Sequence, residues 1–299
     1  MTRALLAAAL ILCACGSQTI LIPAGDQAAA PTADSGGTQD YGPIPEGKVQ
    51  PYDPGSALCV GNNDGRIEAS ELPVALGAVE TFDVNESGTK VGVDIDGTAD
   101  ASGYRTWDFR GVPAPVQARS FVQAPDGYWF AGRFPGATFV SPISLHDTSI
   151  LGVYAAGSDG VRLMGIASAE ESPAAGKTLL SYDSPILVAS FPLYAGRSWE
   201  AKSSYSGATI SGLPEAGEEH YVFTVDAVGT AVLPDFTAEN VLRLRIEVDQ
   251  TFQVGPSQPV HTVQYQFVRE CLGEVARAFG LPNDSGPFEW AQEFRRLGL

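Results

Sequence analysis

The stretch Val241-Leu-Arg-Leu-Arg-Ile-Glu-Val-Asp-Gln-Thr251 decides the fold class of this chain. Its apolar residues Leu242, Leu244, Ile246 and Val248 alternate strictly with arginine, glutamate and aspartate. A period of two places successive side chains on opposite faces of a strand. The stretch therefore predicts a long strand in an antiparallel sheet, with one face buried and the other in water.

Similar segments recur on both sides of this strand, separated by glycine and proline. Strands are predicted at 79–84, 91–95, 104–109, 119–123, 128–131, 138–140, 150–155, 161–168, 179–190, 221–228 and 260–270. Regular strands with such turns are typical of β sandwiches and barrels. We therefore predict a mainly β protein in which residues 79–280 form an antiparallel sandwich or a partly open barrel. A chain of 299 residues allows one large core or two subdomains with a break near 141–149.

Two short helices are predicted around this β body. Ser70 as a cap and Gly77 as a stop predict a helix inside a unit that spans 57–78. An apolar stripe at helical spacing predicts a second helix within 281–299. The residues of that stripe are Trp290, Phe294 and Leu297.

The segment Cys59-Val-Gly-Asn-Asn-Asp-Gly-Arg-Ile-Glu-Ala-Ser-Glu-Leu72 brings oxygen-bearing side chains together at regular spacing. With Gly65 at the sharp turn, it resembles a calcium loop of the EF-hand or dockerin kind. That resemblance implies calcium ligands from Asn62, Asp64, Arg66 (through its carbonyl), Glu68 and Glu71. Val60 stands at the first ligand position and has no side-chain oxygen, so the expected dissociation constant is weak, roughly 10⁻⁴ to 10⁻³ M. The alternative is a tight Asn-Asp-Gly turn without a metal.

The N-terminus has the pattern of an export signal. Arg3 precedes an apolar run that ends at Leu12-Cys-Ala-Cys15. These four residues resemble the lipobox of bacterial lipoproteins, which implies removal of residues 1–14 and acylation of Cys15. By the same resemblance, Gly16 after the cysteine favours the outer membrane. The alternative is an ordinary signal peptide with a coincidental cysteine.

Residues 15–56 are rich in Gln, Ala, Pro, Thr, Ser and Gly and show no period. Such a segment buries too little apolar surface to offset its ordering entropy, so we predict a disordered tether. Beyond it, Cys59 and Cys271 are the two cysteines left after signal removal and acylation. In an oxidising envelope they are expected to form a disulfide. Two free buried thiols or an interchain bond are the alternatives.

The formal net charge of −17 argues against nucleic acid as a partner and against electrostatic binding to anionic lipid. The sequence contains no His-Glu-x-x-His, Gly-x-Ser-x-Gly or P-loop motif, so we do not expect an enzyme. The predicted function is that of a non-catalytic envelope lipoprotein, held to the membrane by its lipid anchor. Its β body would serve a structural, adhesive or assembly role toward a protein partner. The alternative is a periplasmic carrier that holds an apolar ligand inside a curved sheet.

Overall fold

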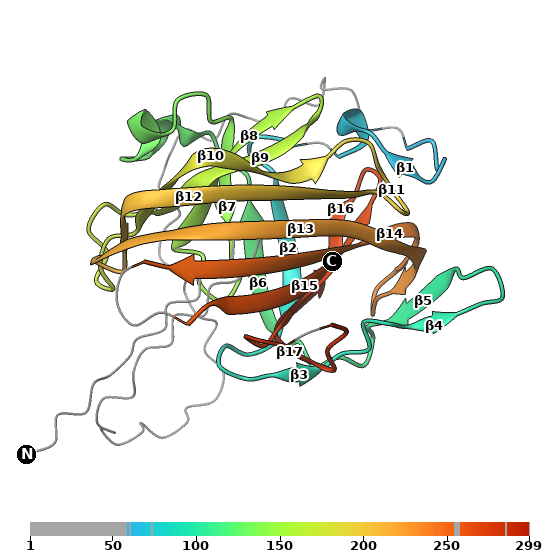
Figure 1. Cartoon of the computed structure of the whole chain (residues 1–299). Coiled ribbons are helices and arrows are strands. Elements are labelled where there is room, and N and C mark those ends of the chain that lie inside the picture. The colour runs from blue at the N-terminus through green and yellow to red at the C-terminus, as the bar shows by residue number, and fades with distance from the viewer. Residues whose placement is uncertain (1–58, 60, 73, 254–257, 285, 299) are drawn as a thin grey trace, which may run out of the picture.

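The chain folds into one large, strongly curved β-sheet (Figure 1). The computed structural model describes residues 59, 61–72, 74–253, 258–284 and 286–298. The predicted signal peptide, Cys15 and the tether lie outside the described residues. Fifteen of the described strands belong to this sheet, and two short strands form a second one.

Twelve strands of the large sheet lie on a single path. In chain order they are β2 (Val79–Val84), β6 (Val116–Phe121), β7 (Phe139–Pro142), β8 (Ile150–Gly157), β9 (Gly160–Ser168), β10 (Leu179–Ser190), β12 (Ser198–Ile210), β13 (Leu213–Val232), β14 (Thr237–Phe252), β15 (Val260–Arg269), β16 (Gly273–Gly280) and β17 (Trp290–Leu297). From β7 to β17, each strand on the path pairs antiparallel with the next, and the path then continues from β17 to β2 and β6. The predicted break near 141–149 lies between β7 and β8, which pair with each other in this same sheet.

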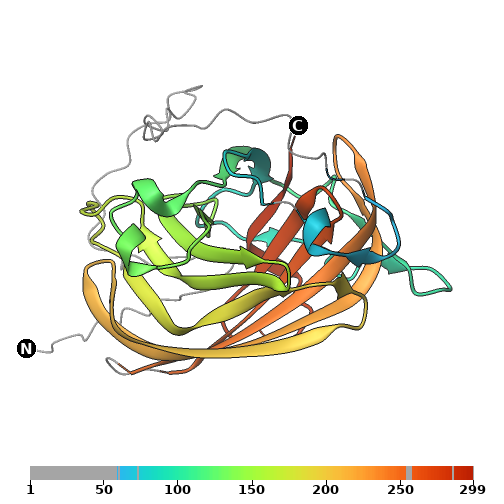
Figure 2. The same ribbon diagram turned by 90° about the horizontal axis from the view of Figure 1, so that it is seen from above.

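The two ends of the path meet, so the sheet nearly closes into a barrel (Figure 2). Just after β6, the backbone N–H of Gln123 donates to the carbonyl of Val140 in β7 at 3.0 Å. The N–H of Val140 donates back to the carbonyl of Gln123 at 2.8 Å. Of the two architectures predicted, the described chain adopts the partly open barrel.

The remaining elements are short. They are β1 (Arg66–Ile67), β3 (Val91–Gly92), β4 (Thr98–Ala99), β5 (Arg105–Asp108) and β11 (Leu193–Tyr194), with 3-10 helices at Ala69–Glu71, Pro125–Gly127 and Ala131–Arg133. Strands β1 and β11 pair with each other, and β3 to β5 attach to the outside of the barrel at β17 and β13. In the described part of the chain, no helix is long and apolar enough to cross a bilayer.

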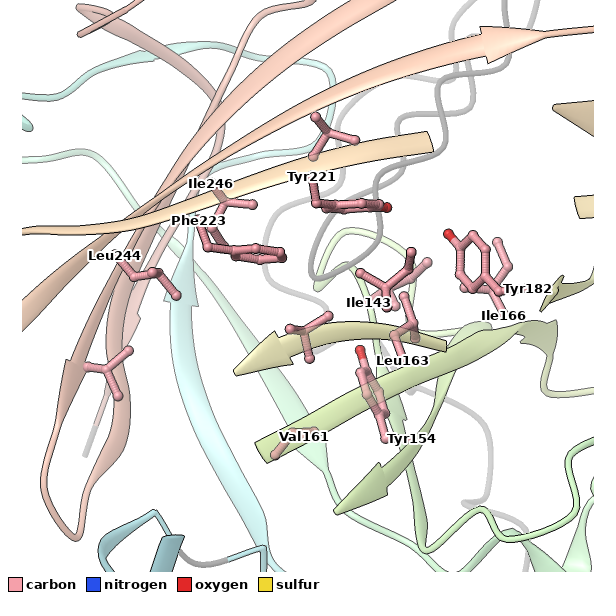
Figure 3. Close-up of a cluster of buried hydrophobic side chains, with 14 of the residues drawn as sticks. Ile143, Tyr154, Val161, Leu163, Ile166, Tyr182, Tyr221, Phe223, Leu244 and Ile246 are labelled. Carbon is pink, nitrogen blue, oxygen red and sulfur yellow. The ribbon is translucent and has the colours of Figure 1, made fainter. Parts of the chain in front are cut away.

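The alternation predicted for β14 is confirmed on its apolar face. Leu242, Leu244 and Ile246 are buried in the barrel interior together with side chains of β8, β9, β10 and β13. Figure 3 shows Leu244 and Ile246 on one side of this cluster and Leu163 on the other. The opposite face is not fully in water, because Arg243 is only 5% exposed and donates to the Asp226 carboxylate at 2.8 and 3.0 Å.

A second core lies outside the barrel, on the outer face of β14 to β17. The segment that carries β3, β4 and β5 packs there, and its Trp107 and Phe109 meet Phe267 edge-on. The ring centroids lie 5.0 and 4.9 Å apart. Phe294 of β17 belongs to the same cluster. This part of the sheet is therefore buried on both faces.

The prediction of a C-terminal helix within 281–299 is wrong, because Trp290–Leu297 forms strand β17. A segment this short is marginal as an isolated helix. As a strand it pairs with both β16 and β2, so its backbone groups are hydrogen-bonded on two sides. The three residues of the predicted apolar stripe therefore do not share one buried face: Trp290 is 48% exposed, whereas Phe294 is fully buried.

The helix predicted after the Asn-Asp-Gly loop is also wrong in extent. The described residues contain only a 3-10 turn at Ala69–Glu71, which begins before the proposed cap at Ser70. The Glu68 N–H donates to the Glu71 carboxylate at 2.9 Å and fixes the start of this turn. Leu72 and Val74 then pack against the interior cluster. Their contact with the barrel, and not helix propensity, determines the path of this segment.

The strand geometry of β17 predicts unequal effects for two aromatic substitutions. Phe294→Ala should lower the free energy of unfolding by about 3–5 kcal/mol, because it empties a buried site between the two layers. Trp290→Ala should cost less than about 1 kcal/mol, because the ring is exposed and its main described partner is Lys90 at 5.4 Å. Urea denaturation of both variants measures this. Equal losses would support the helix and contradict the strand.

Candidate functional site

The barrel contains a cavity of about 240 Å³ that is partly open to solvent. Its apolar wall comes mainly from β7 to β10 and β14 and includes Phe139, Tyr154, Val161, Val188 and Leu244. Its polar wall comes from β2, β15, β16 and β17 and includes Glu80, Gln266, Glu274, Arg277 and Arg295. Pockets that bind small molecules usually combine a largely apolar lining with a few convergent polar groups, which this cavity has.

The polar wall follows from the sequence pattern of strands that are buried on both faces. In β15 the apolar residues Val263, Tyr265 and Phe267 point outward into the second core. The alternate residue Gln266 therefore points into the barrel, where it lines the cavity. The same alternation in β16 and β17 directs Arg277 and Arg295 inward.

Glu274 is the centre of the buried charges. Its carboxylate accepts hydrogen bonds from Arg295 Nε at 2.5 Å, Arg277 Nε at 2.8 Å and Gln266 Nε2 at 2.6 Å. Burial alone would raise the pKa of Glu274, but the two guanidinium groups and the hydrogen bonds outweigh it, so the pKa lies below its usual value. Glu274 is therefore ionised at neutral pH.

A second buried carboxylate, Glu293, completes the cluster. Its oxygens accept from Ser144 Oγ at 2.7 Å and from Arg295 Nη1 at 3.4 Å. Burial alone would lower the pKa of Arg295, but Glu274 and Glu293 together raise it. Arg295 therefore remains charged inside the barrel, with a carboxylate on either side.

Glu80 of β2 differs from these groups. Its side chain lines the same cavity, but its carboxylate forms neither a hydrogen bond nor an ion pair with another described residue. By its accessible surface Glu80 is an exposed residue, so its side chain lines the cavity where the cavity meets solvent. The surrounding protein nevertheless removes part of the water from its carboxyl, and Glu274 repels its charge, so the pKa of Glu80 is raised to about 7 against the opposing effect of Arg295.

The loop predicted to bind calcium lies at one end of the barrel, beside β11 and the turn between β15 and β16 (Figure 1). Cys59 and Cys271 form a disulfide, as predicted, with their Cα atoms 5.5 Å apart. The Glu270 carboxylate accepts the backbone N–H groups of Asn62 at 3.1 Å and Asn63 at 2.9 Å. Gly61 permits this contact, because a Cβ there would lie 2.8 Å from Glu270 Oε2.

The side chains implied as calcium ligands interact with neighbouring residues of the same loop. Asn62 Oδ1 accepts the N–H of Asp64 at 2.8 Å, and Asp64 Oδ1 accepts the N–H of Arg66 at 2.9 Å. Glu71 is buried and caps the 3-10 turn, while Glu68 lies 3.8 Å from the Arg66 guanidinium. Across the ranges described above, no three His, Cys, Asp or Glu side chains are placed to hold one metal ion. These oxygens shape a turn in this structure, and calcium binding stays a prediction.

The loop segment also contributes to the cavity. Leu72 and Val74 line it, and Ile67 is buried in the interior cluster at 2% exposure. A second hollow, lined in part by Ser70 and Ala156, shares Leu72, Val74 and Val161 with the cavity. The clamped loop therefore forms part of the cavity wall at this end of the barrel.

A second polar cluster is buried in the barrel and does not line the cavity. Glu219 is fully buried and accepts from Tyr182 at 2.7 Å, Tyr221 at 2.5 Å and Gln250 at 2.9 Å. Burial raises the pKa of Glu219 despite these hydrogen bonds. The Glu219 carboxylate accepts all three hydrogen bonds and so links β10, β13 and β14. We therefore assign this cluster a structural role.

No family of known proteins matches this chain, and neither the curated proteins nor the solved structures contain a match. The chemistry of the cavity and the loop is therefore what bears on function. Sequence reasoning identified the loop and the disulfide but missed Glu80, Glu274, Arg277 and Arg295. The sequence did contain a signal for Glu274, Arg277 and Arg295. The segments 274–279 (Glu-Val-Ala-Arg-Ala-Phe) and 293–296 (Glu-Phe-Arg-Arg) place charged residues within strands that are otherwise buried.

The disulfide between Cys59 and Cys271 should contribute strongly to the stability of the fold. Replacing both Cys59 and Cys271 with serine should lower the free energy of unfolding by about 2–5 kcal/mol, because the crosslink spans 212 residues. Urea denaturation of the oxidised wild type and of the double variant measures the loss. Dithiothreitol should destabilise the wild type only, and a wild type indifferent to it would contradict the prediction.

Glu80 predicts a specific pH dependence of stability. The folded protein keeps the proton on Glu80 up to about pH 7, whereas the unfolded chain releases it near 4.5. Between these values the unfolded state binds fewer protons, so the contribution of Glu80 to stability falls as pH rises and is constant above pH 7. The free energy of unfolding of the wild type minus that of Glu80→Gln should therefore decrease from pH 4.5 to pH 7.

Denaturation series on both proteins test this, with Glu86→Gln as the control at an exposed carboxyl. Subtracting the variant removes the contribution of Glu219, which titrates in both proteins. A difference that stays constant over this pH range would show that Glu80 titrates alike in the folded and unfolded states.

Proposed function

We propose that this protein is a non-catalytic envelope lipoprotein whose barrel binds a small amphipathic ligand. The cavity of about 240 Å³ carries this proposal, because it combines an apolar wall and polar groups in one partly open pocket. Of the two roles predicted from the sequence, the carrier is favoured over a purely structural or adhesive role. A carrier needs interior space, and adhesion does not.

The proposed ligand is amphipathic because the two walls differ in chemistry. Val161, Val188 and Leu244 offer apolar surface, and burial of apolar surface contributes roughly 25 cal/mol per Å². The opposite wall offers Glu80, which has no described partner. A ligand that is apolar throughout would displace water from this carboxyl without offering a hydrogen bond in its place, which is unfavourable.

The proposed location is the outer membrane, through an acyl chain on Cys15. The resemblance of Leu12-Cys-Ala-Cys15 to a lipobox supports the anchor, and Gly16 supports the membrane. Weak calcium binding by the loop remains part of the proposal in a supporting role. Calcium there would stiffen a segment that the disulfide and Glu270 already fix to the barrel.

Filling the cavity should abolish ligand binding. Isothermal titration calorimetry with n-octanol should give saturable 1:1 binding to the disulfide-bonded mature protein. Val188→Phe should remove this binding, because Val188 is buried and its side chain lines the cavity. Val79→Phe is the matched control, since Val79 is 54% exposed and lies next to the inward-facing Glu80 on the opposite face of β2.

Retained binding in Val79→Phe and loss in Val188→Phe would support the interior site, with circular dichroism confirming that both variants fold. Native mass spectrometry of protein isolated from membranes adds the natural occupant. Equal heats for both variants and the wild type would place the binding elsewhere. Absence of saturable binding by octanol, octylamine and octanoate alike would overturn the proposal.

A further inference from the structure

Two arginines on a cavity wall would ordinarily indicate a site for an anion. Arg277 and Arg295 are both 6–7% exposed and both line this cavity. Their charges are already matched, however, because each donates to Glu274 and Arg295 also faces Glu293. Two buried carboxylates therefore neutralise two guanidinium groups. An anionic ligand would have to displace a carboxylate that is held by charge-assisted hydrogen bonds.

Glu80 is the one charged residue of this group that is not paired with an arginine. Its exposed side chain lines the same cavity, and its carboxylate has no hydrogen bond or ion pair with any other residue that the structure describes. When Glu80 is ionised, the five charged groups Glu80, Glu274, Glu293, Arg277 and Arg295 sum to a net charge of −1. The group available to bind a ligand is thus the Glu80 carboxylate, a negatively charged hydrogen-bond acceptor.

The neighbouring surface fits the same kind of ligand. Phe139 and Tyr154 line the cavity with stacked rings, 4.8 Å apart and inclined by 11°. Aromatic faces carry a negative quadrupole and attract cations. Ser120 and Ser141 also line the cavity, and their hydroxyl oxygens can accept hydrogen bonds from a donor-rich head group.

We propose that the barrel cavity selects a protonated primary amine carried on a short apolar chain, with the ammonium group beside Glu80. The apolar chain lies against Val161, Val188 and Leu244. This assignment rests on the proposed carrier function and adds the chemical class of the ligand. The carboxylate of Glu80, which lines the solvent-open part of the cavity without a described partner, is the feature that distinguishes an amine from an alcohol or a carboxylate.

Binding of such a ligand depends on pH through Glu80. The charged and titratable groups that face it are Glu274 and Arg277 of β16, Arg295 of β17 and Tyr154 of β8, while β6 contributes the neutral Ser120. Burial and Glu274 raise the pKa of Glu80 to about 7, so its charge develops between pH 5.5 and 8.5. An alkylamine, like the lysine side chain with its pKa near 10.4, stays protonated throughout this range.

The test uses three ligands with one tail, n-octylamine, n-octanol and n-octanoate, titrated calorimetrically into the disulfide-bonded mature protein. At pH 8.5 octylamine should bind most tightly and octanoate least. From pH 5.5 to 8.5 the affinity for octylamine should rise by about five- to thirtyfold, following the ionised fraction of a group with a pKa of about 7. The affinity for octanol should stay nearly constant.

Glu80→Gln removes the charge and preserves the shape of the side chain. It should erase both the preference for octylamine over octanol and the pH dependence, while octanol binding persists. Glu86→Gln, at an exposed carboxyl outside the cavity, should leave all three affinities unchanged.

Octanol binding without any preference for the amine would overturn the assignment of the ligand class and leave the carrier function standing. Tighter binding of octanoate would do the same and would return the two arginines to the role of anion site. A preference for octylamine that survives in Glu80→Gln would also overturn it. Failure of all three ligands to bind would overturn the carrier function itself.

Discussion

Burial of both faces of strands β15 to β17 is the constraint on which the rest of this structure depends. The more apolar face of β15 turns outward, where Phe267 meets Trp107 and Phe109. The more polar face must then line the barrel, and any charge on it must find a partner there. Glu274 meets this requirement for Arg277 and Arg295 at once. The cavity owes its mixed lining to this arrangement.

Much of the β architecture could be predicted from the sequence, because alternation is a local property. The strict pattern of 241–251 identified β14, and the cysteine count identified the Cys59–Cys271 bond. Alternation shows which residues share a face, but it does not show which side of the sheet is the inside of a barrel. For β15, the polar face that would be placed in water is instead the interior one. The buried charges of the cavity were missed for that reason.

The two wrong helices have a related cause. The stripe of Trp290, Phe294 and Leu297 fits helical spacing, but the segment is a strand that pairs with β16 on one side and with β2 on the other. The second partner, β2, lies more than a hundred residues away in the sequence. The loop at 59–72 shows the same limit, since its oxygen-bearing residues suit a metal site and a tight turn equally well. Which reading applies depends on whether the oxygens converge, and Asn62 and Asp64 here bond to the backbone two residues ahead.

The position of the disulfide has a mechanical consequence. Cys59 lies where the described chain begins, ahead of the first strand of the barrel, and it is bonded to the turn between β15 and β16. A pulling force applied to the chain ahead of residue 59 would therefore reach the barrel at a covalent crosslink. The force would act on the turn between β15 and β16. It would therefore not act first on β2 at the start of the barrel. The disulfide thus makes the turn between β15 and β16, and not β2, the point where such a force enters the barrel.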